Sequence, residues 1–230
     1  MRLDKFIAHV TDLSRSDARR TIKAGGIRVA GATVYDPQLE VEPTAQVEID
    51  GTPLRAATAR YFMLHKPIGY ICAAKDRRHQ TVLDLLVEDN AAELHIAGRL
   101  DIDTTGLVLL TDDGQWSHRI TAPKSRCEKT YWLQTAEPIQ ETAIEQFARG
   151  LFLHNEKQRL LPAQLQILTT HTARLTLREG KYHQVKRMFG ALGNAVVKLH
   201  REAIGAVVLD SQLEEGCYRS LSTDEIAALA

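Results

Sequence analysis

Cysteine is scarce in this 230-residue sequence, which holds only Cys72, Cys127 and Cys217. Three widely spaced cysteines without metal-ligand spacing argue against a disulfide scaffold and against a zinc site, and they indicate free thiols in a reducing cytosol. No apolar run is long enough to span a bilayer. Because an acid stands at position 4 and no apolar stretch follows, the N-terminus is not a signal peptide. The sequence therefore predicts a cytoplasmic protein outside the membrane.

Net charge is lacking too, because 29 Lys and Arg residues balance 29 Asp and Glu residues. A zero balance alone argues against a nucleic-acid binder, but the charges are unevenly placed. Residues 1–30 hold seven basic side chains against three acidic ones, and residues 176–205 hold six against two. Such separation is typical of a protein with one basic working face. Chance clustering on a mixed surface is the alternative.

Residues 1–26 have the pattern of two short helices. Apolar side chains at positions i, i+3, i+4 and i+7 from Leu3 predict the first. Ser14, with an acid three residues later, predicts the start of the second, and Gly25 predicts its end. Three basic residues recur every fourth position along the second helix: Arg15, Arg19 and Lys23. This stripe suits the phosphate backbone of a nucleic acid, or it is an ordinary solvated helix face.

Short strands are predicted next, at residues 27–29, 33–34 and 46–49. The polar stretch that follows contains Pro53 and predicts a linker. The resulting division is a small domain at 1–52, a linker at 53–60 and a second domain at 61–230.

The second domain mixes strand and helix patterns without regular alternation, which predicts an α+β fold with a mixed, mainly antiparallel sheet. Strand-like runs lie at 61–64, 107–111, 130–134, 164–168 and 173–178. Helical patterns lie at 114–120, 140–149 and 183–192, and Ser222 begins a short final helix.

The segment Asp101-Ile102-Asp103-Thr104-Thr105 places two carboxylates and two hydroxyls in a turn before a buried-looking strand. Loops at a sheet edge commonly carry catalytic groups, although either Asp could simply cap the turn. The string also matches the D-x-D-x-T of magnesium-dependent, haloacid-dehalogenase-like phosphatases. In those enzymes it must follow a hydrophobic strand, whereas here the strong apolar run comes after it.

A resemblance decides between these interpretations. The run Gly98-Arg99-Leu100-Asp101, followed by Thr105-Gly106-Leu107, resembles the G-R-L-D-x-x-T-x-G-L signature of the RsuA branch of the pseudouridine synthases. Segments 65–70, 128–131 and 179–188 resemble three further motifs of these enzymes in the expected order. Residues 1–50 resemble their alpha-L, ribosomal protein S4-like RNA-binding domain. The resemblance thus covers nearly the whole chain.

The resemblance implies that the chain isomerises a uridine of 16S ribosomal RNA, at position 516, without cofactor or metal. It makes Asp101 the catalytic carboxylate, Tyr131 the residue that stacks on the target base, and Lys186 or Arg187 the cation that keeps Asp101 ionised. Many relatives have an arginine where this chain has Lys186, which is a point charge and not a bidentate fork. Other RNA contacts are predicted for Arg99, Thr105, Lys129, Lys181, His183, Gln184 and Arg187.

The expected partner is 16S RNA, either free or in a small-subunit assembly intermediate, and nothing in the sequence predicts more than a monomer. Two alternatives stay open at this point. One is a pseudouridine synthase for large-subunit RNA. The other is a non-catalytic RNA-binding factor of ribosome assembly, which the N-terminal domain would suit equally well.

Overall fold

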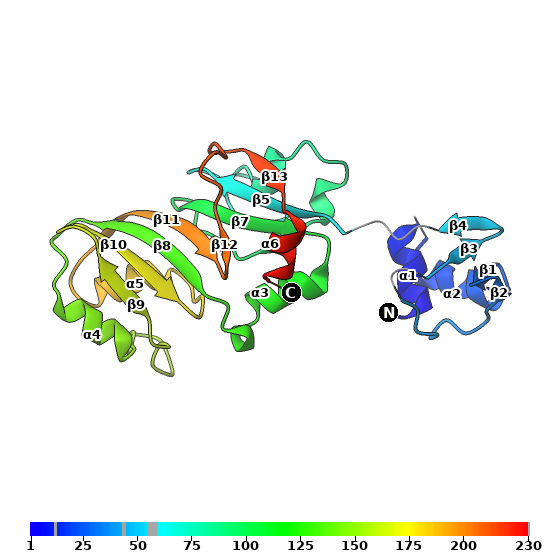
Figure 1. The fold of residues 1–230 in the computed structure, drawn as a ribbon, viewed down its shortest axis with the longest axis horizontal. Coiled ribbons are helices and arrows are strands. Elements are labelled where there is room, and N and C mark those ends of the chain that lie inside the picture. The colour runs from blue at the N-terminus through cyan, green and yellow to red at the C-terminus, as the bar shows by residue number, and fades with distance from the viewer. Residues whose placement is uncertain (12, 43–44, 55–58, 230) are drawn as a thin grey trace. The chain divides into compact units, whose positions relative to one another are not determined.

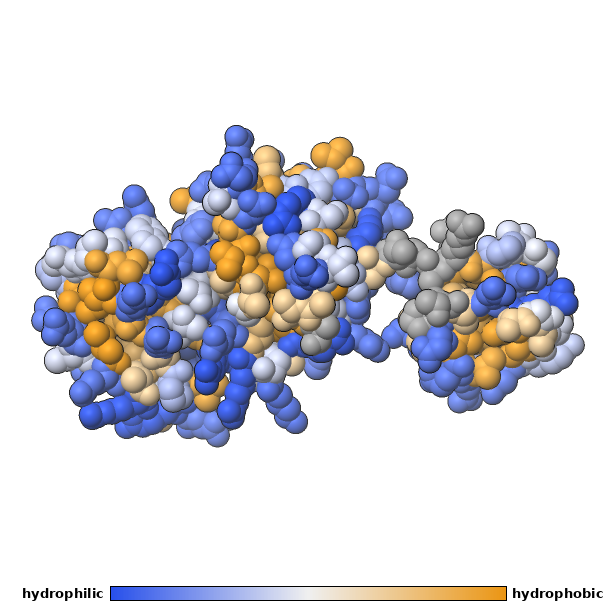
Figure 2. Space-filling model, viewed as in Figure 1, coloured by the Kyte–Doolittle hydropathy of each residue, from blue (hydrophilic) through white to orange (hydrophobic). Residues whose placement is uncertain are grey.

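The computed structural model describes residues 1–11, 13–42, 45–54 and 59–229, and the chain forms two compact units, Met1–Thr58 and Ala59–Ala230 (Figure 1). Hydrophilic residues cover most of the face seen in Figure 2, and the hydrophobic ones form small separate areas on it. Within the described residues, no helix combines the length and the apolar content needed to cross a membrane.

The N-terminal unit packs two helices against a small antiparallel sheet with the strand order β2-β1-β3-β4. Ser14 Oγ accepts a hydrogen bond from the backbone N–H of Asp17 at 3.1 Å, which confirms the predicted helix start. Gly25, with φ +81°, follows the second helix. The elements are α1 (Leu3–Val10), α2 (Arg15–Lys23), β1 (Ile27–Val29), β2 (Ala32–Thr33), β3 (Val47–Ile49) and β4 (Thr52–Leu54).

Strand β4 reaches into the segment that the polar composition assigned to a linker. Glu48 of β3 stands opposite Pro53 of β4 in this pairing. Proline lacks a backbone donor, and it is tolerated here because β4 is the outer strand of the sheet. The rest of the predicted linker falls mostly on residues 55–58, outside the described part of the chain.

The C-terminal unit is built on a sheet with the order β13-β5-β7-β11-β8-β10-β9, in which β6 also pairs with β7 and β12 with β11. Among the described strands, β7 and β11 form the one parallel pair, so the mixed, mainly antiparallel sheet is confirmed. The strands are β5 (Tyr61–Lys66), β6 (His95–Ala97), β7 (Thr105–Thr111), β8 (Lys129–Thr135), β9 (Gln164–Ile167), β10 (Thr172–Leu177), β11 (Val196–Ile204), β12 (Val207–Val208) and β13 (Tyr218–Ser220).

Apolar clusters cover both faces of this sheet. On β7, Val108 and Leu110 belong to a cluster with helices α4 and α5, whereas Leu107 and Leu109 belong to a cluster with α3 and α6. Burial on both faces explains the continuous apolar run of β7. The helices are α3 (Gly114–Thr121), α4 (Thr142–Ala148), α5 (Gln184–Gly190) and α6 (Thr223–Ala227), with short 3-10 turns at Val82–Leu85, Ala91–Glu93 and Pro123–Ser125.

Strand β11, the longest, was not among the predicted strands. Its core positions are taken by Leu199, Arg201 and Ala203, which are at most 9% exposed. An arginine in the middle of the buried set breaks the apolar alternation by which strands are recognised in a sequence. The same arginine lies next to the candidate site.

Candidate active site

Asp101 lies in the turn that joins β6 to β7. A buried ammonium supports this turn from below, because Lys66 Nζ donates hydrogen bonds to the carbonyl oxygens of Thr104 at 2.8 Å and Pro67 at 2.9 Å. Burial lowers the pKa of Lys66. The backbone N–H of Gly69 also donates to Ile102 O at 2.9 Å. The end of β5 therefore holds the turn that carries Asp101 in place.

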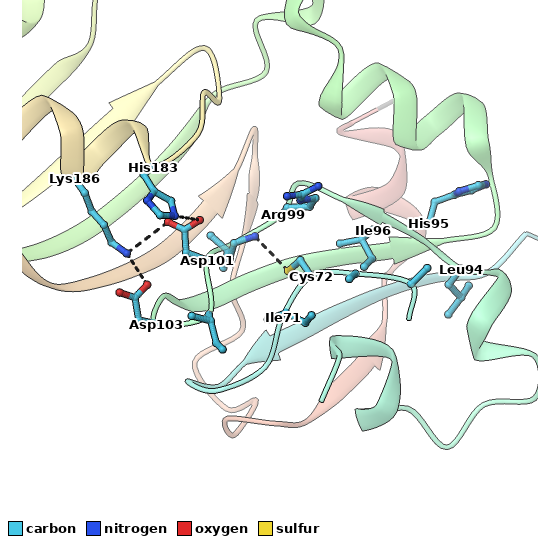
Figure 3. Close-up of a pocket in the computed structure, with 14 residues that line it drawn as sticks. Ile71, Cys72, Leu94, His95, Ile96, Arg99, Asp101, Asp103, His183 and Lys186 are labelled. Carbon is cyan, nitrogen blue, oxygen red and sulfur yellow. Dashed lines mark hydrogen bonds and ion pairs between the residues drawn. The ribbon is translucent and has the colours of Figure 1, made fainter. Parts of the chain in front are cut away.

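A cavity of about 760 Å³ opens beside this turn (Figure 3). Its lining includes Arg99, Asp101, Asp103, His183 and Lys186, which come from the turn and from the start of α5. Its volume is within the usual range for small-molecule sites. The cavity thus brings together five residues from two motifs that lie some eighty positions apart in the sequence.

The ammonium group of Lys186 contacts two carboxylates in this cavity. Lys186 Nζ lies 3.5 Å from Asp101 Oδ2 and 2.5 Å from Asp103 Oδ1 (Figure 3). The hydrogen bond from Lys186 is the main reason that the pKa of Asp103 is lowered. His183 Nε2 lies 3.4 Å from the other oxygen of Asp101, and this contact becomes an ion pair when the imidazole is protonated. The Asp101 side chain is 29% exposed, so it is accessible from the cavity.

Helix α5 directs Lys186 toward this cavity through its amphipathic pattern. Val185, Met188 and Phe189 are buried in the core, as their spacing predicted. Lys186 lies outside this stripe, on the side that faces Asp101. His183 precedes the helix with φ +47°, a conformation unusual for a residue other than glycine.

Arg187, the alternative partner of Asp101, points elsewhere. Its guanidinium donates to Glu156 Oε1 at 2.8 Å, to His154 O at 3.0 Å and to Tyr182 O at 3.2 Å. Lys181 Nζ lies 2.8 Å from the second oxygen of Glu156. Bonds from both cations lower the pKa of Glu156. Lys186 is therefore the cation beside Asp101, while Lys181 and Arg187 tie the third motif to the loop around Glu156.

Arg201 is a site residue that the sequence interpretation missed. Its side chain is buried, and its guanidinium donates to the carbonyl oxygens of Leu107 at 2.8 Å, Gly98 at 2.5 Å and Arg99 at 3.4 Å. It also reaches Tyr131 Oη at 3.5 Å. Arg201 thus joins β7, the turn before Asp101 and the predicted stacking residue.

Two neighbours of Arg201 explain parts of the motifs. A Cβ at Gly106, where φ is +108°, would lie 2.3 Å from Arg201 O, so only glycine fits this position of the signature. Tyr131, opposite Arg201 in the β8–β11 register, is 9% exposed and is not part of the cavity lining. Its connection to Asp101 runs through Arg201 and the carbonyl of Arg99.

Three other predicted RNA contacts also lie off the cavity. Lys129 Nζ is turned inward, where it donates to Cys127 O at 2.8 Å and Ile120 O at 3.2 Å. Burial lowers the pKa of Lys129. Gln184 is 4% exposed and its amide donates to Glu179 Oε1 at 3.0 Å. Thr105 Oγ1 lies 2.8 Å from His200 Nδ1. In this structure all three have local packing partners.

A basic loop at the cavity was also missed. Ala73 and Ala74 line the cavity, and the exposed run Lys75-Asp76-Arg77-Arg78-His79 follows them directly. The carboxylate of Asp76 accepts hydrogen bonds at 2.8 Å from the backbone N–H groups of Arg78 and His79, so it folds the loop. The charge run itself was the available signal.

Two residues of the basic stripe, Arg15 and Arg19, lie around one carboxylate together with Arg2. Asp4 is fully buried, and its Oδ2 lies 2.7 Å from Arg19 Nε, 3.3 Å from Arg15 Nε and 3.0 Å from Arg2 Nη2. Burial would raise the pKa of Asp4, but hydrogen bonds from Arg19, Arg2 and Arg15 outweigh it and lower the pKa to about 2. Arg15 and Arg19 remain half exposed, and Lys23 is exposed.

A basic helical module in one unit and a carboxylate–ammonium pair at a cavity in the other suit, as a class, an enzyme that acts on a nucleic acid. The family model for RNA pseudouridylate synthase matches residues 60–191, and the S4 domain model matches residues 1–47. The chain therefore belongs to the RNA pseudouridylate synthase family, as its motifs predicted, and it is an isomerase.

Individual relatives match over the full length. The chain is 53% identical over 230 residues to ribosomal small subunit pseudouridine synthase A of Escherichia coli (strain K12), with 100% of both chains covered. It is 48% identical to the protein of that name from Vibrio cholerae serotype O1, with 100% of this chain and 99% of the relative covered. A solved pseudouridylate synthase structure is 47% identical, with a TM-score of 0.74 and full coverage of both chains.

Proposed function

We propose that this enzyme converts a uridine of 16S ribosomal RNA to pseudouridine, and that uridine 516 is the target. The full-length relatives are named for action on the small ribosomal subunit, which favours 16S RNA over large-subunit RNA. The observation that carries the proposal is the position of Asp101, which lines a cavity of about 760 Å³ with its carboxylate 3.5 Å from Lys186 Nζ.

The reaction needs a negative charge next to the ribose. The bond from C1′ to N1 of uracil breaks and a bond from C1′ to C5 forms, while C5 loses a proton and N1 gains one. Positive charge develops at C1′, and a carboxylate stabilises it electrostatically or by covalent attack. Asp101 supplies this carboxylate, and Lys186 offsets the cost of placing it beside Asp103. Because no electrons are exchanged overall, the chemistry itself requires no redox cofactor.

The base must leave the RNA stack to reach Asp101, at a cost of a few kcal/mol. Tyr131 stacks on the extruded uracil in this proposal. Because Tyr131 is 9% exposed and does not line the cavity, the site must open toward β8, where Arg201 holds the tyrosine hydroxyl, before the base can stack on the ring. Arg99 and His183, which line the cavity, contact the target nucleotide.

Phosphates on either side of the target need basic surfaces. Arg15, Arg19 and Lys23 provide one in the S4 domain, and the loop at 75–79 provides another at the cavity. We further propose that the enzyme works as a monomer in the cytoplasm, where its free cysteines would stay reduced. Its substrate there is 16S RNA, free or in an assembly intermediate.

The test compares wild type with Asp101→Asn on 16S RNA, on an assembly intermediate and on 23S RNA, and maps pseudouridine in each. The variant should form none, because the amide keeps the shape but lacks the charge, and its RNA affinity should stay near wild type. Asp103→Asn is the matched comparison: it removes the neighbouring charge but keeps Asp101, so it should still form pseudouridine, at a reduced rate. An active Asp101→Asn would remove Asp101 from the chemistry. Pseudouridine formed only in 23S RNA would overturn the assignment of 16S RNA as the substrate. No pseudouridine in any of the three RNAs would favour a non-catalytic RNA-binding factor.

A further inference from the structure

Tyr182 is an exposed aromatic residue beside the catalytic carboxylate. Its side chain is 74% exposed, although large aromatic rings are usually at least half buried. One face of the ring stacks on His183, with centroids 3.8 Å apart and an interplanar angle of 18°. The high exposure leaves the other face open to solvent.

The backbone beneath this ring is held in place on several sides. Arg187 Nη1 donates to Tyr182 O at 3.2 Å, and the backbone N–H of Lys181 donates to the Gln184 side chain at 2.9 Å. The Lys181 side chain is tied to Glu156 at 2.8 Å. A ring on such a fixed turn loses little conformational freedom when a partner stacks on it, so most of the contact energy is kept as affinity.

The ring is also close to the reacting centre. His183, on which Tyr182 stacks, places Nε2 3.4 Å from Asp101 Oδ1. The imidazole that backs Tyr182 therefore contacts the catalytic carboxylate through its Nε2 edge. The nucleotides that flank an extruded uridine stay attached to its ribose through their phosphates, so they remain near the same carboxylate. The cavity lining itself contains no Phe, Tyr or Trp among the described residues, and Tyr182 is the exposed tyrosine of the third motif.

Extruding a base leaves its two neighbours in the RNA without a stacking partner on one side. An aromatic side chain restores such a contact for any of the four bases. We propose that the open face of Tyr182, backed by His183, stacks on the base of a nucleotide adjacent to the target uridine. This inference rests on the proposed function of the site and adds a second base to it.

The experiment uses the full-length enzyme and a 16S RNA fragment into which a synthetic segment is ligated. Three RNAs are compared, one intact, one abasic on the 5′ side of the target and one abasic on the 3′ side. Tyr182→Leu keeps apolar volume without a ring, and Tyr182→Phe keeps the ring. On intact RNA, Tyr182→Leu should raise Kd and KM about tenfold, with a smaller effect on kcat. Tyr182→Phe should restore binding.

On one of the two abasic RNAs, wild type and Tyr182→Leu should bind equally well, because the stacked base is missing. An equal loss on all three RNAs, or no loss on intact RNA, would overturn the inference. Failure of the proposed function would be recognised separately, because the wild-type enzyme would then form no pseudouridine in the intact RNA. The Kd comparison decides the role of Tyr182 in either case. Thermal melting of each variant shows whether the fold is kept.

Discussion

The two units contain ion clusters of opposite design. In the N-terminal unit one carboxylate, Asp4, has three arginines around it, which leaves two positive charges in excess (three minus one). In the catalytic unit one ammonium, Lys186, has two carboxylates beside it, which leaves one negative charge in excess (two minus one). The same chemical pair thus produces a cationic surface in one unit and an anionic site in the other.

Burial of the central group sharpens this difference. Asp4 is fully buried while Arg15 and Arg19 are half exposed, so the hidden carboxylate orients guanidiniums that still present N–H groups to solvent. Such groups match phosphate oxygens. Lys186 is 24% exposed and Asp101 29%, so the anionic excess faces the cavity. We infer that the first cluster binds the RNA backbone and the second stabilises positive charge at the ribose.

Among changes to the charges around Asp101, replacing Lys186 should have the largest effect. Lys186→Met removes the only cation of the described residues found in a salt bridge with both Asp101 and Asp103. Asp103 loses the bond that lowers its pKa, and two facing carboxylates then favour uptake of a shared proton. We expect kcat to fall by roughly a hundredfold or more at neutral pH, with recovery toward higher pH as that proton is lost. A pH–rate profile measures this.

Lys186→Arg is the matched control, since it keeps the positive charge. It should retain most of the activity and the acidic limb of the wild-type profile. An unchanged kcat in Lys186→Met would show that Lys186 is not needed to keep Asp101 ionised. The inference that the anionic cluster serves catalysis would then be wrong.

Replacing Arg201 tests whether the position of Asp101 depends on the hydrogen bonds that Arg201 donates to the neighbouring backbone. Arg201→Lys keeps the charge but cannot reach the Gly98, Leu107 and Tyr131 oxygens together. Since unsatisfied buried carbonyls cost about 1–3 kcal/mol each, we expect the melting temperature to fall by roughly 3–6 °C. Displacement of Asp101 should lower kcat about tenfold, with RNA affinity unchanged. A drop in melting temperature with wild-type kcat would assign Arg201 to stability alone.

The sequence predicted local structure better than it predicted the contacts of charged side chains. The caps at Ser14 and Ser222 and the buried stripe of α5 were confirmed because each depends on neighbours in the chain. Strand β11 was missed because Arg201 interrupts its pattern. The choice between Lys186 and Arg187 depends on Glu156, which binds Arg187 from 31 positions away. Which carboxylate meets which cation is decided by long-range packing, which periodicity does not encode.

Removing arginines from the cationic cluster should have a smaller effect. Arg15→Ala with Arg19→Ala should weaken RNA binding about tenfold at physiological salt and flatten the slope of log K against log salt by roughly 1.4, which corresponds to two lost contacts with single-stranded phosphates. Saturating kcat should be unchanged. Lys23→Ala is the control that leaves Asp4 untouched, and it should flatten the slope by about half as much. An unaltered slope in the double variant would remove this cluster from the RNA interface.

The smallest effect on catalysis at neutral pH concerns Asp4, which contributes to the stability of the N-terminal unit and loses that contribution in acid. Its pKa in the folded unit is about 2, below the ordinary value of 3.8. The folded state therefore holds fewer protons than the unfolded state between these values, and the stability that Asp4 adds is complete above about pH 4 and lost as pH falls through 2. Amide-exchange protection of Leu3–Val10 should decline in this window. Tryptophan fluorescence follows the other unit, which contains both Trp116 and Trp132.

In the Asp4→Asn variant, the amides of Leu3–Val10 should be less protected from exchange at neutral pH, and their protection should not change in this acid window. Loss of protection at the same pH in wild type and Asp4→Asn would show that another carboxylate controls the unit, and Asp4 would no longer be the centre of its cluster.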